Sequence, residues 1–386
     1  MDGGRLLLAT TLAGLARRGH HLSLIAPVVA PAAEAAAIRQ ALEPFCTPHL
    51  VPIQPRSYLI SALRSRLARR PLTIDRHHHD AIAAEVERLL AREAFDVVHV
   101  EQLQALAQAR PALARGLPVV LRAQNVESDL WAKAAAHRPA LSFFARRESR
   151  RLAANEGEAV ASVAATLALT EPDAARLTEL AGGRGRVDVL RAPFEGVLPA
   201  GPTPLPGEPA VVLVGSEGWA PNRDSVAHFV RDLWPAVARA LPGAELHVFG
   251  NWRPSLTRER VHGHGSPADA AEPFAEGSIL VLPLRYASGV RMRILEAWAR
   301  GIPVVATPAA AAGLDATGGV ELLLAESAED FASALARLQG DRELRECMVA
   351  SGRLLLRRQH DPGEAAAALE GIYRGLAAAR SRVNRS

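Results

Sequence analysis

Lysine and cysteine are nearly absent from this sequence of 386 residues, which contains one lysine, Lys133, and two cysteines, Cys46 and Cys347. Two cysteines this far apart can form neither a disulfide framework nor a cysteine zinc site, and they fit a reducing compartment. With 45 basic and 41 acidic residues, the formal net charge is only +4. Any basic partner surface must therefore be local, and no nucleic acid partner is predicted.

Long apolar runs are also absent. No uncharged run reaches the roughly 18 residues of a membrane span, because the best candidate, residues 22–38, contains Pro27, Pro31 and Glu34. We expect no signal peptide, because the first residues, Met1-Asp2-Gly3-Gly4-Arg5, lack the pattern of one. A hydrophobic content of 49% argues against disorder of the whole chain. We expect a soluble, cytoplasmic protein with two domains, at about 100–200 residues each.

Short apolar runs alternate with longer amphipathic stretches, and most of the runs are continuous, as buried parallel strands are. This alternation predicts a doubly wound α/β architecture. The candidate strands are His21–Ala26, Phe95–Val100, Pro118–Arg122, Ala165–Thr170 and Val187–Leu190, followed by Ala210–Gly215, Ala244–Gly250, Ser278–Pro283, Ile302–Thr307 and Glu321–Leu324.

Proline and glycine are concentrated in residues 199–209, which predicts an interdomain linker between two Rossmann-like halves. A helix is expected from about Asn222 to Leu241, and Pro235 should kink or split it. The first half opens with a helical pattern from Gly4, whereas a doubly wound domain normally opens with a strand. Either the start codon is misplaced and a strand is missing, or this half is unusual.

Residues 279–307 form the most informative segment: a buried strand, a Ser288-Gly289 turn, a helix and a second strand. The start of a helix offers backbone N–H groups and a favourable dipole to an anion. Arg291 and Arg293 in the first turn oppose that dipole, a cost that a phosphate between them would offset. The alternative is a solvated basic turn.

The second part of this segment, Glu296-Ala-Trp-Ala-Arg-Gly-Ile-Pro-Val-Val-Ala-Thr307, resembles the donor-site motif of glycosyltransferase family 4, the retaining GT-B enzymes. That motif has two glutamates eight positions apart, and the second binds the ribose of the nucleotide. The resemblance gives this role to Glu296, whereas Ser288 stands where the first glutamate would be. In the branch resembled, Arg and Lys follow a glycine-rich turn; Arg291 matches the first, and Arg293 stands for the second.

Further resemblances run along the chain. Gly3-Gly4-Arg5 resembles the family's opening glycine loop, and Asp96-Val-Val-His99 matches one of its strands. Arg122-Ala-Gln-Asn-Val-Glu127 resembles an acceptor-side motif in which Gln124 replaces a histidine. Val214–Asn222 resembles the loop that opens the nucleotide domain.

The resemblance implies a GT-B fold, with two facing Rossmann-like domains and the active site in the cleft between them. Four parts of the chain are expected. Residues 1–198 form the acceptor-binding domain, with its first strand apparently missing, and residues 199–209 form the linker. Residues 210–361 form the domain that binds the nucleotide sugar, and residues 362–386 form a C-terminal helix that packs back toward the first domain.

The catalytic residues that the resemblance predicts are Glu296, Arg291 and Arg293. The predicted donor site consists of Gly215, Trp219, Asn222, Asn251, Ser288, Gly289, Arg291, Arg293 and Glu296. The predicted acceptor side consists of Gly3, Gly4, Glu101, Gln124, Asn125 and Glu127.

Transfer from a nucleotide sugar requires stabilisation of the departing diphosphate. No two aspartates stand two residues apart, so the Asp-x-Asp metal motif is absent, which favours fixed cations and helix dipoles over a metal. We expect a metal-independent, retaining hexosyltransferase without a cofactor. Its acceptor would be a surface glycan in polysaccharide biosynthesis, a lipid-linked sugar or a small metabolite.

Three alternatives remain. A non-catalytic relative would bind a nucleotide sugar or a partner without turnover. A nicotinamide-dependent oxidoreductase would need a glycine-rich fingerprint directly after a strand, and this fingerprint is absent. A sugar epimerase of the GT-B fold would convert a nucleotide sugar without an acceptor.

Two arginine-rich segments, residues 61–70 and 143–151, could bind anionic lipid headgroups or a lipid-diphosphate acceptor, although a solvated helix face is the simpler interpretation. The arginines expected to contact the inner face of the membrane are Arg64, Arg66, Arg69 and Arg70.

Overall fold

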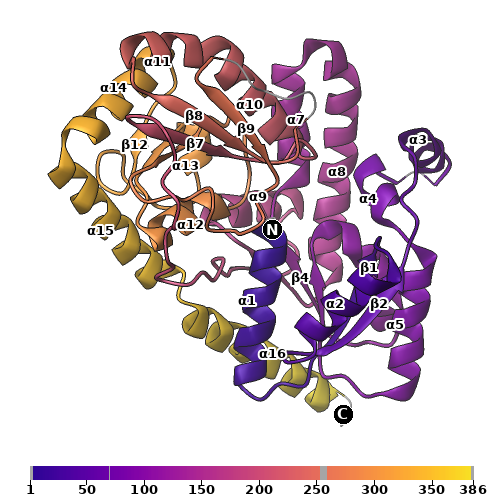
Figure 1. Cartoon of the computed structure of the whole chain (residues 1–386). Coiled ribbons are helices and arrows are strands. Elements are labelled where there is room, and N and C mark those ends of the chain that lie inside the picture. The colour runs from indigo at the N-terminus through magenta and orange to yellow at the C-terminus, as the bar shows by residue number, and fades with distance from the viewer. Residues whose placement is uncertain (1–2, 69, 253–258, 384–386) are drawn as a thin grey trace. The chain divides into compact units, whose positions relative to one another are not determined.

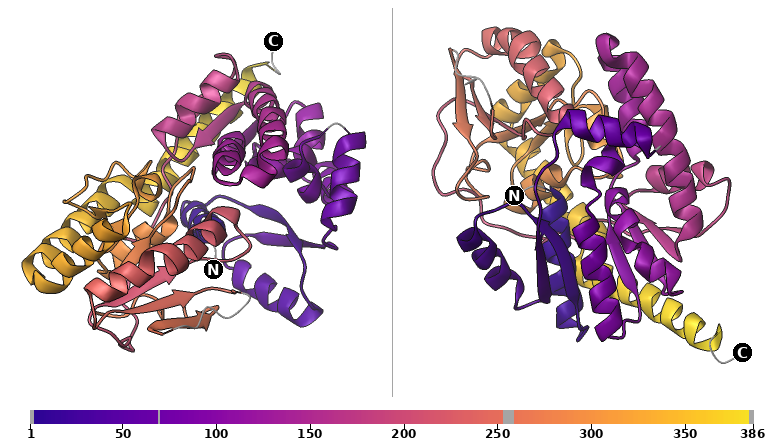
Figure 2. Two further views of the ribbon diagram at one scale, coloured as in Figure 1. Left: turned by 90° about the horizontal axis from the view of Figure 1, so that it is seen from above. Right: turned by 90° about the vertical axis from the view of Figure 1, so that its right-hand side faces the viewer.

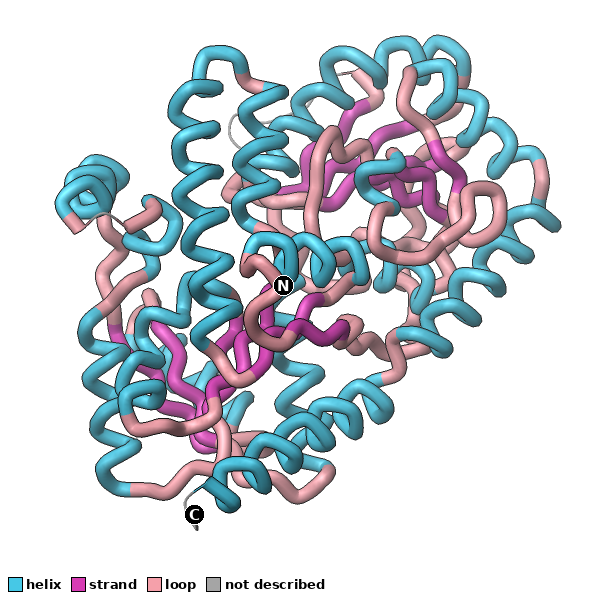
Figure 3. The backbone as a smooth tube through the Cα atoms, turned by 180° about the vertical axis from the view of Figure 1, so that it is seen from behind, coloured by secondary structure: helices cyan, strands magenta, loops and turns pink. Residues whose placement is uncertain are grey.

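The computed structural model describes residues 3–68, 70–252 and 259–383. The chain divides into two compact units. The first contains residues 4–192 and the C-terminal segment from Pro362, and the second contains Pro193–Asp361 together with Gly3. In both units helices flank parallel strands (Figure 1, Figure 3). The predicted linker, residues 199–209, lies within the second unit.

The first unit begins with a helix and ends with another from the far end of the chain. Its elements are α1 (Gly3–Arg17), β1 (Ser23–Val28), α2 (Ala32–Leu42), β2 (Thr47–Pro52), α3 (Tyr58–Leu67), α4 (Leu72–His77), α5 (Asp80–Arg92), β3 (Val98–Glu101), η1 (Leu103–Ala109), α6 (Arg110–Ala114), β4 (Val119–Ala123), α7 (Glu127–His137), η2 (Pro139–Leu141), α8 (Ser142–Ser162), β5 (Ala165–Ala168), α9 (Glu171–Leu180), β6 (Val187–Val189) and α16 (Pro362–Val383).

The strands of this unit form two groups, and the pairing within each group is parallel. β3, β4, β5 and β6 are neighbours in that order, and β1 pairs with β2 in a separate ribbon (Figure 2). β4 and β5 are buried along their whole length and form the centre of this unit.

Helix α16 packs on the strands of the first unit. Its Leu369 is buried in a cluster with Leu15, Val120 and Leu167. The guanidinium of Arg18, the residue directly after α1, forms an ion pair with the carboxylate of Glu370 on α16. The last segment of the chain therefore contributes core residues to the unit that contains its beginning.

The second unit contains one six-stranded parallel sheet in the order β12-β11-β10-β7-β8-β9. Its elements are β7 (Ala210–Val214), α10 (Ala220–His228), η3 (Phe229–Leu233), α11 (Trp234–Ala240), β8 (Glu245–Phe249), β9 (Val261–Gly265), β10 (Ile279–Leu282), α12 (Met292–Arg300), β11 (Val304–Ala306), α13 (Pro308–Ala311), β12 (Leu323–Leu324), α14 (Ala328–Gly340) and α15 (Arg342–Gln359). From β7 the chain adds β8 and β9 on one side, and then β10, β11 and β12 on the other. The strand order therefore reverses between β7 and β10.

The long helix predicted around Pro235 is split, as expected. α10 gives way to the π-helical turn η3, and α11 begins one residue before Pro235. Because proline has no N–H to donate and its ring clashes with the preceding turn, the helix widens there. Phe229 and Trp234 are buried in the core of this unit.

No helix in the described part of the chain is long and apolar enough to cross a lipid bilayer.

Candidate functional site

The reversal of strand order between β7 and β10 marks the place where the second unit can bind a ligand. In open parallel sheets, ligands bind at the carboxyl ends of the strands beside such a reversal. The loop after β7 contains Gly215 and Trp219, and the loop after β10 contains Ser288 and Gly289. The structure thus brings predicted donor residues about 70 positions apart in the sequence to the same edge of one sheet.

The loop after β10 is held against α10. The buried Tyr286 donates a hydrogen bond from its hydroxyl to Asp224 at 2.7 Å, and the backbone N–H of Arg285 donates to the Ser225 hydroxyl at 3.2 Å. Gly289 has a φ of 71°, in the left-handed region that favours glycine. These contacts fix the turn that leads into α12.

Arg291 stands at the start of α12, which has no side-chain cap. Its guanidinium donates to the carbonyl oxygen of Ser288 and lies 5.0 Å from the centre of the Trp219 ring. The side chain is only 8% exposed. The loops after β7 and β10 therefore hold one cation at a helix N-terminus, where an anion is otherwise favoured.

Glu296 is buried on α12 between two arginines of the same helix. Its carboxylate accepts a hydrogen bond from Arg293 Nη1 at 2.6 Å, and from Arg300 Nε and Nη2 at 3.3 and 3.2 Å. Arg300 also donates to the backbone carbonyl of Pro199. Because each carboxylate oxygen has two lone pairs, a ribose hydroxyl could bind Glu296 while these arginines remain in place.

Two glycines bring the ends of β7 and β8 close together. A Cβ atom on Gly215 would lie 3.1 Å from Cγ of Asn222, the predicted donor residue on α10. Gly250, with a φ of 139°, approaches so closely that its Cβ would lie 1.7 Å from the carbonyl oxygen of Gly215. Gly250 was not predicted as a site residue, although it ends a predicted strand. Asn251, which was predicted, follows it and is exposed.

Replacing Gly250 by alanine should destabilise the second unit. The added methyl group overlaps a backbone oxygen, and the left-handed backbone disfavours any L side chain, so the expected loss is roughly 3 kcal/mol in the free energy of unfolding. The measurement is urea-induced unfolding of both variants Gly250→Ala and Gly218→Ala. Gly218 lies in the loop after β7 with no atom within 4 Å of its Cβ position, so it is the matched control. Equal stability of the two variants would contradict the close approach.

The predicted acceptor-side residues of the first unit gather at the carboxyl ends of β3 and β4. Arg122, 1% exposed, donates from Nε to both carboxylate oxygens of Glu101 at 3.0 and 3.1 Å, and from Nη1 to the Thr11 hydroxyl at 3.1 Å. Gln124 donates to Glu101 at 3.2 Å and accepts from Gln102 at 3.0 Å. Gln124 is therefore oriented by two neighbours at the position where the resembled motif has a histidine.

A half-buried histidine and a half-buried tyrosine complete this network, and neither was predicted as a site residue. His99 Nε2 lies 3.3 Å from Glu101, and its Nδ1 lies 2.6 Å from the hydroxyl of Tyr373 on α16. Burial opposes ionisation of Glu101, but the charge of Arg122 and the hydrogen bond from His99 outweigh it and hold the pKa of Glu101 well below its usual range. Burial lowers the pKa of His99. A neutral His99 that donates to Glu101 and accepts from Tyr373 fits both directions.

A second buried carboxyl lies at the start of α7. The backbone N–H of Glu127, a predicted acceptor-side residue, donates to Glu156 Oε1 at 2.6 Å. Burial raises the pKa of Glu156 to about 7, although the backbone N–H groups of Glu127 and Ser128 donate to it. Burial also raises the pKa of Glu127. Glu156 was missed because nothing in its local sequence indicates a partner 29 positions away.

The remaining acceptor-side predictions lie at element ends. Asn125 is half-buried between β4 and α7, and Gly4 lies in the first turn of α1. Gly3 belongs to the second unit and lies so near Met292 that a Cβ would be 2.8 Å from Cγ of that methionine.

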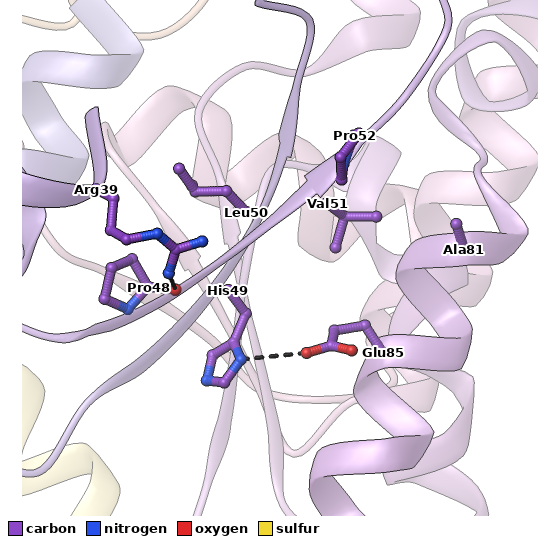
Figure 4. A pocket seen from close by; sticks show the side chains of 8 residues that line it. All are labelled: Arg39, Pro48, His49, Leu50, Val51, Pro52, Ala81 and Glu85. Carbon is purple, nitrogen blue, oxygen red and sulfur yellow. Dashed lines mark hydrogen bonds and ion pairs between the residues drawn. The ribbon is translucent and has the colours of Figure 1, made fainter. Parts of the chain in front are cut away.

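A hollow of about 290 Å³ lies elsewhere on the first unit, beside β2 and α5. Figure 4 shows its lining, in which His49 Nδ1 lies 3.1 Å from Glu85. None of the predicted donor or acceptor residues lines it. Among the described residues, no group of three histidine, cysteine, aspartate or glutamate side chains could hold a metal ion. Metal independence of the activity stays a prediction.

Residues 208–341 match the family described as Glycosyl transferases group 1. A comparison of the whole chain with curated proteins found no match. Among solved structures, sucrose-phosphate synthase from Thermosynechococcus elongatus is similar with a TM-score of 0.73 and 16% identity, over 98% of this chain and 94% of that one.

HepE of Anabaena, solved in complex with UDP and glucose, has a TM-score of 0.68 and 15% identity over 97% of this chain and 96% of that one. The Escherichia coli trehalose-6-phosphate structure with bound UDP-2-fluoro glucose gives 0.61 and 11%, over 92% and 99%. The predicted fold class is confirmed: the chain has a GT-B fold, and most of its second unit matches the group 1 glycosyltransferases.

Proposed function

We propose that this protein is a retaining glycosyltransferase that moves a sugar from a nucleotide-diphosphate sugar to a glycan, lipid-linked or small-molecule acceptor. The observation that carries the proposal is the arrangement at the reversal of strand order. A buried carboxylate, Glu296, and a buried cation, Arg291, flank the start of one helix there. The match of residues 208–341 to group 1 glycosyltransferases and the UDP-glucose bound by HepE support the choice of donor.

Each of these residues has a distinct part in the proposed reaction. Glu296 accepts hydrogen bonds from the ribose hydroxyls. Arg291 and the N-terminus of α12 balance the charge that develops on the departing diphosphate, which is the main electrostatic task of this transfer. Arg293 holds Glu296 and adds a second positive charge. With cations fixed in this way, the leaving group needs no metal.

The acceptor is proposed to bind to the first unit through Glu101, Gln124 and Glu127. The low pKa of Glu101 keeps it ionised at neutral pH, so it orients hydroxyl groups as an acceptor of hydrogen bonds. In a retaining transfer the acceptor attacks the face that the diphosphate leaves, and the departing phosphate takes the acceptor proton. The anomeric configuration of the product, measured by NMR, tests retention directly.

The donor site is tested by thermal unfolding with UDP, GDP, dTDP, ADP and their sugar conjugates, in EDTA. At a ligand concentration about 100-fold above Kd, binding should stabilise the protein by roughly 2.7 kcal/mol. We expect one nucleotide family to raise the unfolding temperature of the wild type and not that of Glu296→Ala. Glu346→Ala is the control, because Glu346 is an exposed glutamate paired with an arginine of its own helix, Arg342.

The outcomes separate the candidate functions. If no nucleotide stabilises the wild type, the donor site is wrong. If a nucleotide binds but its sugar conjugate is never turned over with any acceptor class, the protein is the non-catalytic binder. If a nucleotide sugar is converted without an acceptor, it is an epimerase.

A further inference from the structure

Helix α3 in the first unit exposes its apolar face and buries its polar one. Ile60, Leu63 and Leu67 are 55%, 61% and 76% exposed, and their spacing of three and four residues places them on one side of the helix. On the other side, Ser61 and Ser65 are buried. A surface helix of a globular protein normally has the opposite arrangement, so this helix presents an apolar stripe to its surroundings.

A second exposed apolar group lies where α8 begins. Phe143 is 83% exposed and Leu141 is 50% exposed. The two regions are fastened together through Arg151 of α8, which donates to the backbone carbonyl of Ser65 at 3.0 Å and to that of Arg70. Figure 1 shows α3 at the periphery of the first unit, beside α4 and α8. We refer to Ile60, Leu63, Leu67, Leu141 and Phe143 as the exposed apolar patch.

The charges around this patch are positive. Six arginines occur in residues 55–79, and the only acidic residue there, Asp75, is fully buried beside Arg64. In residues 139–151 the only acidic residue, Glu148, is also buried, where its carboxylate accepts from the backbone N–H of Leu72. The exposed arginines around the patch are Arg66, Arg146, Arg147 and Arg150.

The exposed arginines only partly match the four that the sequence predicted to contact the membrane. Arg66 is exposed as predicted, whereas Arg64 is engaged with Asp75 and Arg70 is half-buried. Arg69 lies outside the described residues.

We propose that the exposed apolar patch binds an anionic lipid surface, with its side chains between the lipids and the surrounding arginines at the phosphates. Apolar side chains beside arginine, in two segments whose own acidic side chains are buried, match the two attractions that hold a protein on such a surface. A lipid surface also demands no shape complementarity, which suits side chains spread over two helices. The binding requires neither the donor site nor transfer activity.

The test is co-sedimentation of the full chain with vesicles of phosphatidylcholine alone, or of phosphatidylcholine with about a third phosphatidylglycerol. The wild type is expected to bind the anionic vesicles at least roughly ten-fold more tightly than the neutral ones, and high salt should weaken this binding. The double substitution Leu63→Ser and Leu67→Ser should reduce binding roughly ten-fold or more, because it removes two inserted side chains. Arg66→Glu should reduce binding to anionic vesicles only.

Leu354→Ser is the matched control, since Leu354 is a leucine that is 54% exposed on helix α15 of the second unit. It should bind vesicles like the wild type. All these positions are exposed, so the variants should unfold at the temperature of the wild type, which a thermal scan verifies. Failure of the wild type to bind anionic vesicles overturns the proposal and leaves a protein partner for the patch. Undiminished binding by the double variant overturns it as well.

Discussion

Substitution of Arg291 by alanine is expected to lower kcat about 10²–10³-fold, with a smaller change in KM for the nucleotide sugar. The reason is that negative charge on the diphosphate grows as the sugar departs, so a fixed cation stabilises the transition state more than the bound donor. Arg291 can do this because the carbonyl of Ser288 and the ring of Trp219 already hold its guanidinium in a buried position. The measurement is the rate of nucleoside diphosphate release from the donor identified by thermal unfolding.

Two further variants distinguish this role from a structural one. Arg291→Lys keeps the charge but loses the planar fork, so it should recover only part of the rate. Arg285→Ala removes an exposed arginine from the same loop and should leave kcat unchanged. If Arg291→Ala loses stability while kcat is retained in the folded fraction, the guanidinium only supports the loop, and the assignment to the diphosphate is wrong.

The sequence predicts best those parts of the fold that are buried on both faces. β4, β5, β7 and β10 are buried along all or nearly all of their length, and each was predicted within a few residues. β2 and β9 were missed because both lie at sheet edges, where prolines, histidines and glycines are tolerated. The Gly263-His-Gly265 segment, in which two glycines flank a histidine, belongs to the edge strand β9.

In the candidate sites, the sequence predicts residues that are close together in the chain better than contacts between distant segments. Arg291, Arg293 and Glu296 could be predicted because all three lie within six consecutive positions of the chain. The residues that hold them could not, because Asp224 meets Tyr286 only after β7 and β10 become neighbours. Tyr373 joins His99 only when the last helix of the chain packs on the first unit. A contact between distant segments leaves no local pattern in either of them.

Glu156→Gln is expected to raise stability relative to the wild type as the pH increases from about 4.5 to 7. In that range the unfolded chain loses the proton of Glu156, whose ordinary pKa is 4.5, whereas the folded protein keeps it until about pH 7. Because the folded state binds more protons, the stability of the wild type falls as the pH rises through this range. A difference of roughly 2.5 pKa units corresponds to about 3 kcal/mol.

Urea-induced unfolding at pH 4.5, 6 and 8 measures this effect as the difference in unfolding free energy between Glu156→Gln and the wild type. Glutamine keeps the volume and an oxygen that accepts from the backbone N–H of Glu127, so the difference should be small at pH 4.5 and should grow to about 3 kcal/mol at pH 8. Glu158→Gln, an exposed position on the same helix, should show no such growth. A difference that stays constant with pH would mean that Glu156 is not held protonated by burial. Glu127, at the start of α7, lies beside Glu156, and burial raises the pKa of its carboxyl too. Ionising Glu156 at neutral pH would therefore place a negative charge beside a second carboxyl that already resists ionisation.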